Sequence, residues 1–239
     1  MSGAVDGGLA GTGTGAVGYP VLIIDDHELF STSLTMALRS KGFDAGVLPV
    51  AYVPGFLGGN AGPTGLVVLD LDLGHDSSGH RVDGADLVEG LRARGWKVLV
   101  VTGSLDDSRV AAAIAAGAIG SVPKSRPFEA LLQTVAAAAE GQPVMTRTEH
   151  REWLERHRHH VAKEREVARR LARLSPRERE VLALLAEGMR AAAIAAHFVV
   201  SMPTVRTQIR SILSKLQVGS QLEAVALLRQ ESAPGSRHT

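Results

Sequence analysis

The chain has 239 residues, of which 45% are apolar, so it is long enough for one or two globular domains. It contains no cysteine, which excludes disulfide bonds, thiolate metal sites and cysteine nucleophiles and fits a reducing cytosol. The net charge of +1 conceals two parts, because residues 1–145 carry an excess of acidic side chains and residues 146–239 an excess of basic ones. A basic carboxyl-terminal part favours a phosphate-rich partner such as DNA.

The two ends of the chain are expected to be disordered. Residues 1–18 are rich in glycine and have no hydrophobic periodicity, and residues 231–239 are short and polar. No apolar stretch reaches the roughly 18 residues of a membrane span, and the first residues lack a secretory signal. We therefore expect a cytoplasmic protein that does not associate with membrane.

Residues 19–141 alternate short apolar runs with longer segments of helical periodicity, which predicts a parallel sheet with helices on both faces. The predicted strands are Val21–Ile24, Ala45–Val50, Leu66–Leu69, Val98–Val101 and Ile119–Val122. The predicted helices are Leu29–Lys41, Gly84–Arg94, Asp106–Ala116 and Pro127–Glu140. Prolines and glycines in Ala51–Thr64 predict that any helix there is short or broken. The fold class is a flavodoxin-like α/β domain with a five-stranded parallel sheet of order 2-1-3-4-5.

Residues 142–173 are predicted to form a helical linker. Thr146 and Glu149 have the spacing of a capping box, and a charged helical run follows. Leu154, Val161 and Ala168 recur every seven residues, but polar residues occupy the second apolar row. The linker is therefore either a short dimeric coiled coil or a solvated connecting helix.

Residues 174–230 are predicted to form a small all-α domain. Ser175 and Pro176 have the order of a helix N-cap and first helical residue, and helical periodicity follows as far as Glu187. Further helices are expected over Ala191–His197, Met202–Leu216 and Leu222–Arg229. The middle pair has the proportions of a helix-turn-helix.

Polar residues follow four of the predicted strands. Asp25 and Asp26 end the first strand, Asp70 ends the third, Thr102 ends the fourth and Lys124 follows the fifth. Because the carboxyl ends of parallel strands share one edge of the sheet, we expect these side chains to converge. Like charges this close need a cation, and carboxylate oxygens suit Mg²⁺.

This set of residues supports phosphoryl transfer to Asp70. Its carboxylate would attack phosphorus in line, the metal and Lys124 would offset the charge on the equatorial oxygens, and Thr102 would bond one of them. Each residue alone has an ordinary structural explanation as a turn former, a helix cap or a solvated side chain. Their joint position at matched strand ends favours the functional interpretation.

Residues 19–141 resemble the receiver domain of bacterial two-component response regulators. The resemblance is carried by the apolar run before Asp25 and Asp26 and by Val-Val-Leu-Asp70, Val-Val-Thr102 and Val-Pro-Lys124. It implies that Asp70 is the phosphoacceptor and that a sensor histidine kinase is the phosphodonor. It also implies that Asp25, Asp26, Asp70 and the backbone carbonyl of Asp72 bind Mg²⁺.

The chain departs from this family's pattern in three places. Ser121 stands where an aromatic residue usually acts as a rotamer switch, which puts that signalling route in doubt. The stretch Gly74–His80 makes the loop after Asp70 about six residues longer than usual. Pro123 lacks a backbone donor, which a strand tolerates at the edge of a sheet.

Residues 174–229 resemble the LuxR-type helix-turn-helix of the NarL/FixJ regulators, through Leu-Ser-Pro-Arg-Glu-Arg-Glu-Val-Leu, Ala-Glu-Gly, Ile194-Ala195, Thr204-Val205 and Lys215-Leu216. The resemblance makes Met202–Leu216 the recognition helix. It places three side chains in the major groove: Arg206, Thr207 and Arg210. It places three others at DNA phosphates: Ser201, Thr204 and Lys215. Ala191–Ala193 and Gly219 depart from the family and remove polar or basic residues.

The sequence is thus interpreted as a DNA-binding transcriptional response regulator and not an enzyme. Phosphorylation of Asp70 would alter dimerisation and DNA binding, with double-stranded DNA, a sensor histidine kinase, a second copy of the chain and RNA polymerase as candidate partners. One alternative is an atypical regulator that responds to a small ligand or a protein without being phosphorylated. Another is a phosphatase of the haloacid dehalogenase type, with Asp70 as nucleophile and Asp72 as general acid; the late position of this motif in the chain disfavours it.

Overall fold

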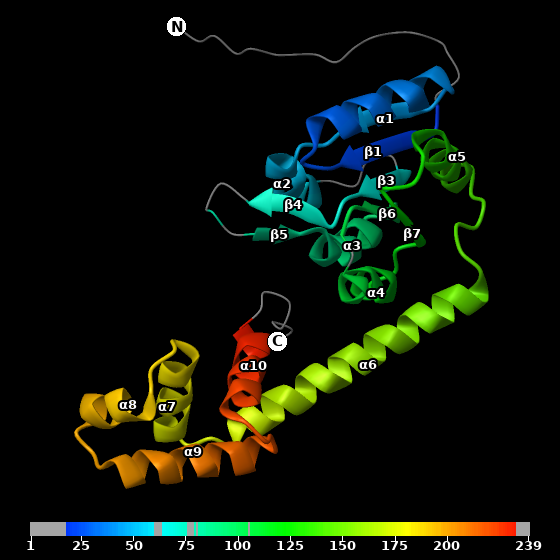
Figure 1. Ribbon diagram of the computed structural model, residues 1–239. Coiled ribbons are helices and arrows are strands. Elements are labelled where there is room, and N and C mark those ends of the chain that lie inside the picture. The colour runs from blue at the N-terminus through cyan, green and yellow to red at the C-terminus, as the bar shows by residue number, and fades with distance from the viewer. Residues whose placement is uncertain (1–17, 60–63, 76–78, 80, 105, 233–239) are drawn as a thin grey trace, which may run out of the picture. The chain divides into compact units, whose positions relative to one another are not determined.

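The structure is a computed structural model that describes most of the chain, namely residues 18–59, 64–75, 79, 81–104 and 106–232. The chain divides into an N-terminal unit, residues 1–155, and a C-terminal unit, residues 156–239 (Figure 1). The expected leader, apart from Gly18, and the expected tail, apart from its first two residues, lie outside the described residues. Among the described helices, none combines the length and the hydropathy that crossing a lipid bilayer requires.

The centre of the N-terminal unit is a parallel sheet of five strands in the order β2-β1-β3-β6-β7. Its strands are β1 (Pro20–Ile24), β2 (Asp44–Val47), β3 (Leu66–Leu69), β6 (Lys97–Thr102) and β7 (Gly120–Pro123). Every neighbouring pair is parallel, so the predicted order 2-1-3-4-5 is confirmed, with β6 and β7 as the fourth and fifth strands. Pro123 ends β7 at the edge of the sheet, where its missing donor is tolerated.

Helices cover both faces of this sheet (Figure 1). They are α1 (Glu28–Ser40) and α5 (Phe128–Ala139) on one face, and α2 (Val53–Gly58), α3 (Gly84–Ala93) and α4 (Asp107–Ala115) on the other. Because successive side chains of a strand point to opposite faces, Leu66 and Val68 pack with α1 and α5. Val67 and Leu69 pack on the other face. Burial on both faces explains why β3 is apolar at every position.

The segment between β2 and β3 differs in part from the prediction. The strand predicted over Ala45–Val50 ends at Val47 instead, and the short 3₁₀ helix η1 (Val50–Tyr52) follows Pro49. Proline has no N–H for the strand ladder and fixes its own φ, so the strand cannot continue through this position. The expected short helix is confirmed, since α2 spans only Val53–Gly58.

The long segment after Asp70 contains a feature that the sequence analysis did not include. Strands β4 (Asp72–His75) and β5 (Arg81–Asp83) pair in an antiparallel two-stranded sheet separate from the main one. Gly74 adopts the left-handed conformation, with φ of 69°, at the irregular part of this pair. The described residues on either side of the longer loop therefore pair as strands near the carboxyl end of β3, and we call the β4–β5 pair the hairpin.

Helix α6 (Arg147–Ala172) begins at the predicted capping box. The Thr146 side chain accepts the Glu149 N–H at 3.2 Å, and the Glu149 carboxylate accepts the Thr146 N–H at 2.7 Å. Near its start, Trp153 and Leu154 pack against the core of the N-terminal unit. Val161 is half-buried and Ala168 is exposed in the single chain, so the choice between a coiled coil and a connecting helix stays a prediction.

The C-terminal unit is built from short helices around one apolar core. They are α7 (Pro176–Ala186), α8 (Ala191–Phe198), α9 (Met202–Leu216) and α10 (Gln221–Ser232). The turn from α8 to α9 passes through Val199, whose left-handed conformation, with φ of 54°, ends α8. Val205, Ile209, Ile212 and Leu216 form the buried face of α9. The predicted small all-α domain with a helix-turn-helix is confirmed.

Candidate functional site

The carboxyl ends of β1 and β3 bring three aspartates together. Asp25 and Asp26 follow β1, and Asp70 follows β3, the neighbouring strand, with its N–H bonded to the Ile24 carbonyl at 2.9 Å. Asp25 and Asp70 are buried, at 7% and 2% exposure, whereas Asp26 is exposed. The predicted convergence of Asp25, Asp26 and Asp70 is thus observed. We call these three side chains the acidic pocket.

Lys124 lies against the two buried members of the acidic pocket. Its ammonium is 2.7 Å from Oδ2 of Asp25 and 2.6 Å from Oδ2 of Asp70. The backbone N–H of Lys124 donates to the Thr102 carbonyl, and this bond fixes Lys124 directly after β7. Burial disfavours the charged ammonium, but the hydrogen bonds to the two aspartates outweigh it and hold the pKa of Lys124 above its usual value.

The buried carboxylates are incompletely neutralised. Burial raises the pKa of Asp25, although hydrogen bonds from the Lys124 ammonium and the His27 N–H act in the opposite direction. Asp70 Oδ1 is buried and has no hydrogen-bond partner among the described residues. A buried carboxylate oxygen without a donor is costly, so this atom is suited to a cation or another electrophilic group.

The acidic pocket fits a divalent cation. Ligand atoms of Asp25, Asp26, His27 and Asp70 lie within 4.8 Å of one another. Carboxylate oxygens are the ligands that Mg²⁺ prefers, and the exposure of Asp26 leaves one side open to water ligands. The unpartnered oxygen of Asp70 supplies the observation on which the fit rests. The residues present therefore match the expected magnesium site.

His27 is a neighbour of the site that the sequence analysis did not single out. Its Nδ1 lies 2.8 Å from Oδ1 of Asp26 and 3.2 Å from Oδ1 of Asp25. It also lies 3.5 Å from the Lys124 ammonium. Its place directly after the two aspartates in the sequence was the only signal available.

Thr102 and Ser121 are two further positions of the N-terminal unit that the sequence analysis singled out. Thr102 ends β6 and is buried, but its hydroxyl accepts the Ser104 N–H at 3.1 Å, and its bond to a phosphoryl group stays a prediction. Ser121 lies half-buried in β7, where the family usually has an aromatic residue.

The hairpin places Asp72 beside the acidic pocket, at the start of β4. The Asp72 carboxylate pairs with Arg81 of β5 at 3.0 Å, and Arg81 lowers the pKa of Asp72. The role of the Asp72 carbonyl in metal binding stays a prediction. Arg109 of α4 bonds both carboxylate oxygens of Asp83 and the Leu71 carbonyl, so it ties α4 to the base of the hairpin. No spacing in the sequence indicated this contact.

Helix α9 carries the predicted DNA-contacting residues of the C-terminal unit. Arg206, Thr207 and Arg210 are exposed on the side opposite the buried face, and the two arginines form no ion pair in the described part of the chain. Ser201 caps the helix by accepting the Thr204 N–H, and their hydroxyls are 2.8 Å apart. The described geometry leaves the two arginines available to an external partner.

Lys215 has a partner inside the protein. Its ammonium lies 2.6 Å from Oε2 of Glu178, a buried residue of α7. Oε1 of Glu178 accepts the Ser211 hydroxyl at 2.6 Å, and Oε2 also accepts the Ser175 N–H. Burial disfavours the charged carboxylate, but these bonds outweigh it and lower the pKa of Glu178 to about 2. Lys215 thus has a structural role, and its contact with DNA phosphate stays a prediction.

Comparison with known proteins agrees with this geometry. Residues 21–136 match the model of the response regulator receiver domain, and residues 172–228 match that of the bacterial regulatory proteins of the luxR family. The transcriptional regulatory protein LiaR of Bacillus subtilis is 30% identical over 85% of this chain and 93% of its own. The nitrate/nitrite response regulator NarP of Escherichia coli is 30% identical over 90% of this chain and 97% of its own.

Solved structures give a further comparison. A structure of the response regulator RcsB of Salmonella typhimurium is 21% identical, with a TM-score of 0.44, and covers 90% of this chain and 100% of that chain. One matched domain model lies in each of the two units, and LiaR and NarP match this chain across both. The chain therefore belongs to the two-component response regulators of the NarL/FixJ family, with a receiver domain followed by a LuxR-type DNA-binding domain, and it acts as a transcription regulator.

Proposed function

We propose that Asp70 is the residue that receives a phosphoryl group from a sensor histidine kinase, and that Asp25, Asp26, Asp70 and the Asp72 carbonyl hold the required Mg²⁺. The observation that carries this proposal is the unpartnered oxygen of Asp70 beside an ammonium that is 2.6 Å from its other oxygen. A carboxylate in these surroundings is oriented through one oxygen and has its other oxygen without a donor.

In the proposed step, a carboxylate oxygen of Asp70 attacks the phosphorus of a phosphohistidine. The new P–O bond forms as the P–N bond breaks, and the imidazole leaves with the bonding pair and takes a proton from solvent. Lys124 keeps the carboxylate oriented and then bonds an equatorial phosphoryl oxygen, and the Thr102 hydroxyl donates to another while it still accepts the Ser104 N–H. Bound Mg²⁺ supplies positive charge against the phosphoryl oxygens.

The proposed output is a change in DNA binding. Phosphorylation alters the surface of the N-terminal unit and promotes pairing of two chains, whose α9 helices then contact adjacent half-sites. Arg206, Thr207 and Arg210 would contact base edges, whereas Ser201, Thr204 and Lys215 would contact phosphates. The exposure and unpaired state of Arg206 and Arg210 support this arrangement. DNA, the kinase and RNA polymerase as partners would place this activity in the cytoplasm.

The direct experiment uses a small-molecule phosphodonor, acetyl phosphate, with and without Mg²⁺. Intact-mass spectrometry should show one added phosphoryl group on the wild-type chain with Mg²⁺, and none on the Asp70→Asn variant. Asp44→Asn, at an exposed position of β2, is the matched control and should be phosphorylated like the wild type. No mass change in the wild type would contradict the proposal and favour a regulator that responds to a ligand.

A further inference from the structure

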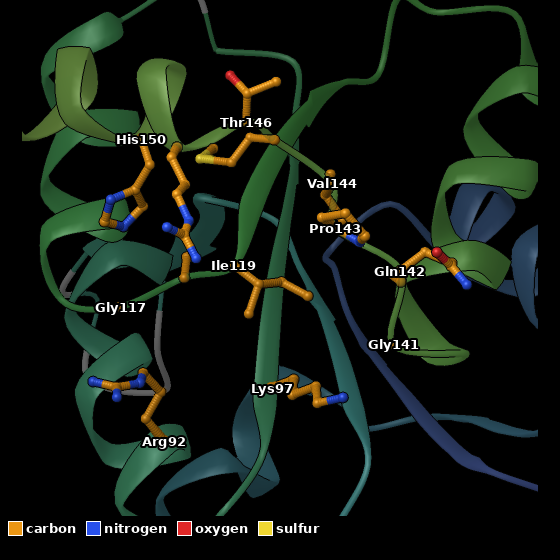
Figure 2. A pocket seen from close by; sticks show the side chains of 14 residues that line it. Arg92, Lys97, Gly117, Ile119, Gly141, Gln142, Pro143, Val144, Thr146 and His150 are labelled. Atoms are coloured by element: carbon orange, nitrogen blue, oxygen red, sulfur yellow. The ribbon is translucent and has the colours of Figure 1, made fainter.

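A cavity in the N-terminal unit lies at the amino-terminal edge of the sheet. It has a volume of about 550 Å³, which is in the range of small-molecule sites. Figure 2 shows its walls, which come from the end of α3, the start of β6, the loop before β7, the segment that joins α5 to α6 and the first turn of α6. The acidic pocket lies at the opposite, carboxyl ends of the strands, so the two sites are separate. We call this cavity the basal pocket.

The charge of the basal pocket contrasts with the acidic unit that contains it. Arg92, Lys97, Arg147 and His150 line it, and no acidic side chain does. Within the described part of the chain none of the four forms an ion pair, and only Arg92 has a side-chain hydrogen bond, to the Ala116 carbonyl at 3.2 Å. Three cationic side chains and an imidazole that line one cavity without counter-charges favour an anionic ligand there.

One of these cations is held in place by the backbone. The Arg92 guanidinium lies across Gly117, where a Cβ atom would be 2.5 Å from one of its nitrogens. Gly117 also has a φ of 102°, which a residue with a side chain rarely adopts. The glycine therefore leaves the space that Arg92 fills at the wall of the basal pocket.

The remaining lining is apolar. Ile119 and Val144 contribute hydrophobic surface (Figure 2), and Met145 also lines the cavity. A single inorganic phosphate would fill only a small part of the volume and would leave this surface uncovered. The combination fits a ligand with several phosphate groups joined to a ring or another apolar body.

We propose that the basal pocket binds a phosphorylated small molecule of nucleotide size, with its phosphates at Arg92, Lys97, Arg147 and His150 and its apolar part against Ile119 and Val144. Arg92 and Lys97 belong to α3 and β6 of the receiver domain, whereas Arg147 and His150 belong to α6. The ligand thus bridges the receiver domain and the first turn of the helix that leads toward the DNA-binding domain. Binding stabilises the position of that turn on the receiver domain.

The test is calorimetric titration of the full chain with ATP, inorganic tripolyphosphate and adenosine. ATP should bind more tightly than tripolyphosphate, and adenosine should not bind measurably. The fluorescence of Trp153, one helical turn after His150, should change with the same affinity. Tripolyphosphate binding as tightly as ATP would overturn the apolar part of the proposal, and no binding by either would overturn all of it.

Variants assign the binding to the basal pocket. Lys97→Gln combined with Arg147→Gln should weaken ATP binding by about tenfold or more, because two charge-assisted contacts are lost. Lys41→Gln, an exposed lysine after α1, is the control and should bind ATP normally. A variant with both Arg206→Gln and Arg210→Gln, on the proposed DNA-binding face, should also bind ATP normally. Loss of ATP binding in the Arg206→Gln/Arg210→Gln variant would show general attraction to the DNA-binding face and would overturn the proposal. Unchanged ATP binding in the Lys97→Gln/Arg147→Gln variant would overturn it as well. Circular dichroism of each variant checks its fold.

Discussion

Each unit of this protein contains a lysine ammonium 2.6 Å from a buried carboxylate, and the two pairs differ in what surrounds them. Around Glu178, donors reach both carboxylate oxygens, and the pKa of this residue is lowered to about 2. Around Lys124, two buried aspartates share one ammonium, the pKa of Asp25 is raised, and one oxygen of Asp70 has no described partner. The complete network leaves no Glu178 oxygen without a donor, whereas the incomplete one leaves an unpartnered Asp70 oxygen at the place where we propose that a metal and a phosphoryl group bind.

The largest expected effect is that of Lys124→Gln. This change leaves Asp25 and Asp70 buried without an ammonium between them, so it should destabilise the N-terminal unit by about 3 kcal/mol. Millimolar Mg²⁺ should restore most of the loss, because the cation supplies the missing charge. Urea unfolding followed by tryptophan fluorescence measures this, since Trp96 and Trp153 both lie in the N-terminal unit. A loss that Mg²⁺ does not reduce would contradict the comparison.

Disruption of the network around Glu178 should lower stability in a way that Mg²⁺ does not restore. Glu178→Gln should destabilise the C-terminal unit by about 2 kcal/mol, because hydrogen bonds to a buried charge are removed. Mg²⁺ should have no influence. The matched control is Glu180→Gln, which removes only an exposed ion pair with Arg177 and should cost much less. Equal losses in the two variants, measured by circular dichroism, would argue against the network.

The same residue predicts a dependence on pH. Because the folded-state pKa of Glu178 is lowered from 4.5 to about 2, its contribution to stability is present above about pH 4.5 and is lost as the pH falls toward 2. The unfolding free energy of the C-terminal unit should fall over this range. In Glu178→Gln, which cannot ionise, this part of the decrease should be absent. An unchanged pH profile in the variant would contradict this assignment.

DNA-binding measurements should distinguish Arg210, which forms no ion pair among the described residues, from Lys215, which is paired with Glu178. Arg210→Ala should cost about 1–3 kcal/mol on the preferred sequence and reduce sequence preference, because a base contact is lost. Lys215→Ala should weaken binding to all sequences alike, and it should also destabilise the C-terminal unit because Glu178 loses its ammonium. Affinities for specific and random DNA at one salt concentration make the distinction. Equal losses on both DNAs for both variants would contradict the assignment.

The smallest expected effect has the opposite sign. Asp70→Asn should stabilise the N-terminal unit by about 1 kcal/mol without Mg²⁺, because one of two buried carboxylates that share Lys124 is removed. Asp44→Asn, at an exposed position, should change the free energy of unfolding little. Destabilisation by Asp70→Asn would show that the Asp70 carboxylate is a structural partner, as Glu178 is.

Much of the fold could be predicted because local patterns determine it. The apolar run at Leu66–Leu69 indicates a strand buried on both faces, and the aspartates after two such runs meet because parallel neighbours end at one edge. The capping residues at Thr146 and Ser175 marked helix starts correctly. These features depend on a few adjacent residues, which the sequence displays directly.

The features that were missed depend on contacts between distant residues. Glu178 and Lys215 are on different helices, and nothing in their spacing shows that they meet. The β4–β5 hairpin contains polar and glycine residues without an alternating apolar pattern, so it was predicted only as a longer loop. The cations of the basal pocket likewise come from separate elements that only the folded chain brings together.

The most direct test of the central claim is to locate the phosphoryl group on the chain. The protein is treated with acetyl phosphate and Mg²⁺ and then with hydroxylamine, which attacks acyl phosphates and converts the carboxyl group to a hydroxamate. Tandem mass spectrometry of the peptides should place this modification at Asp70. A phosphoryl group on His27, which lies beside the acidic pocket, or on no residue at all would contradict the account.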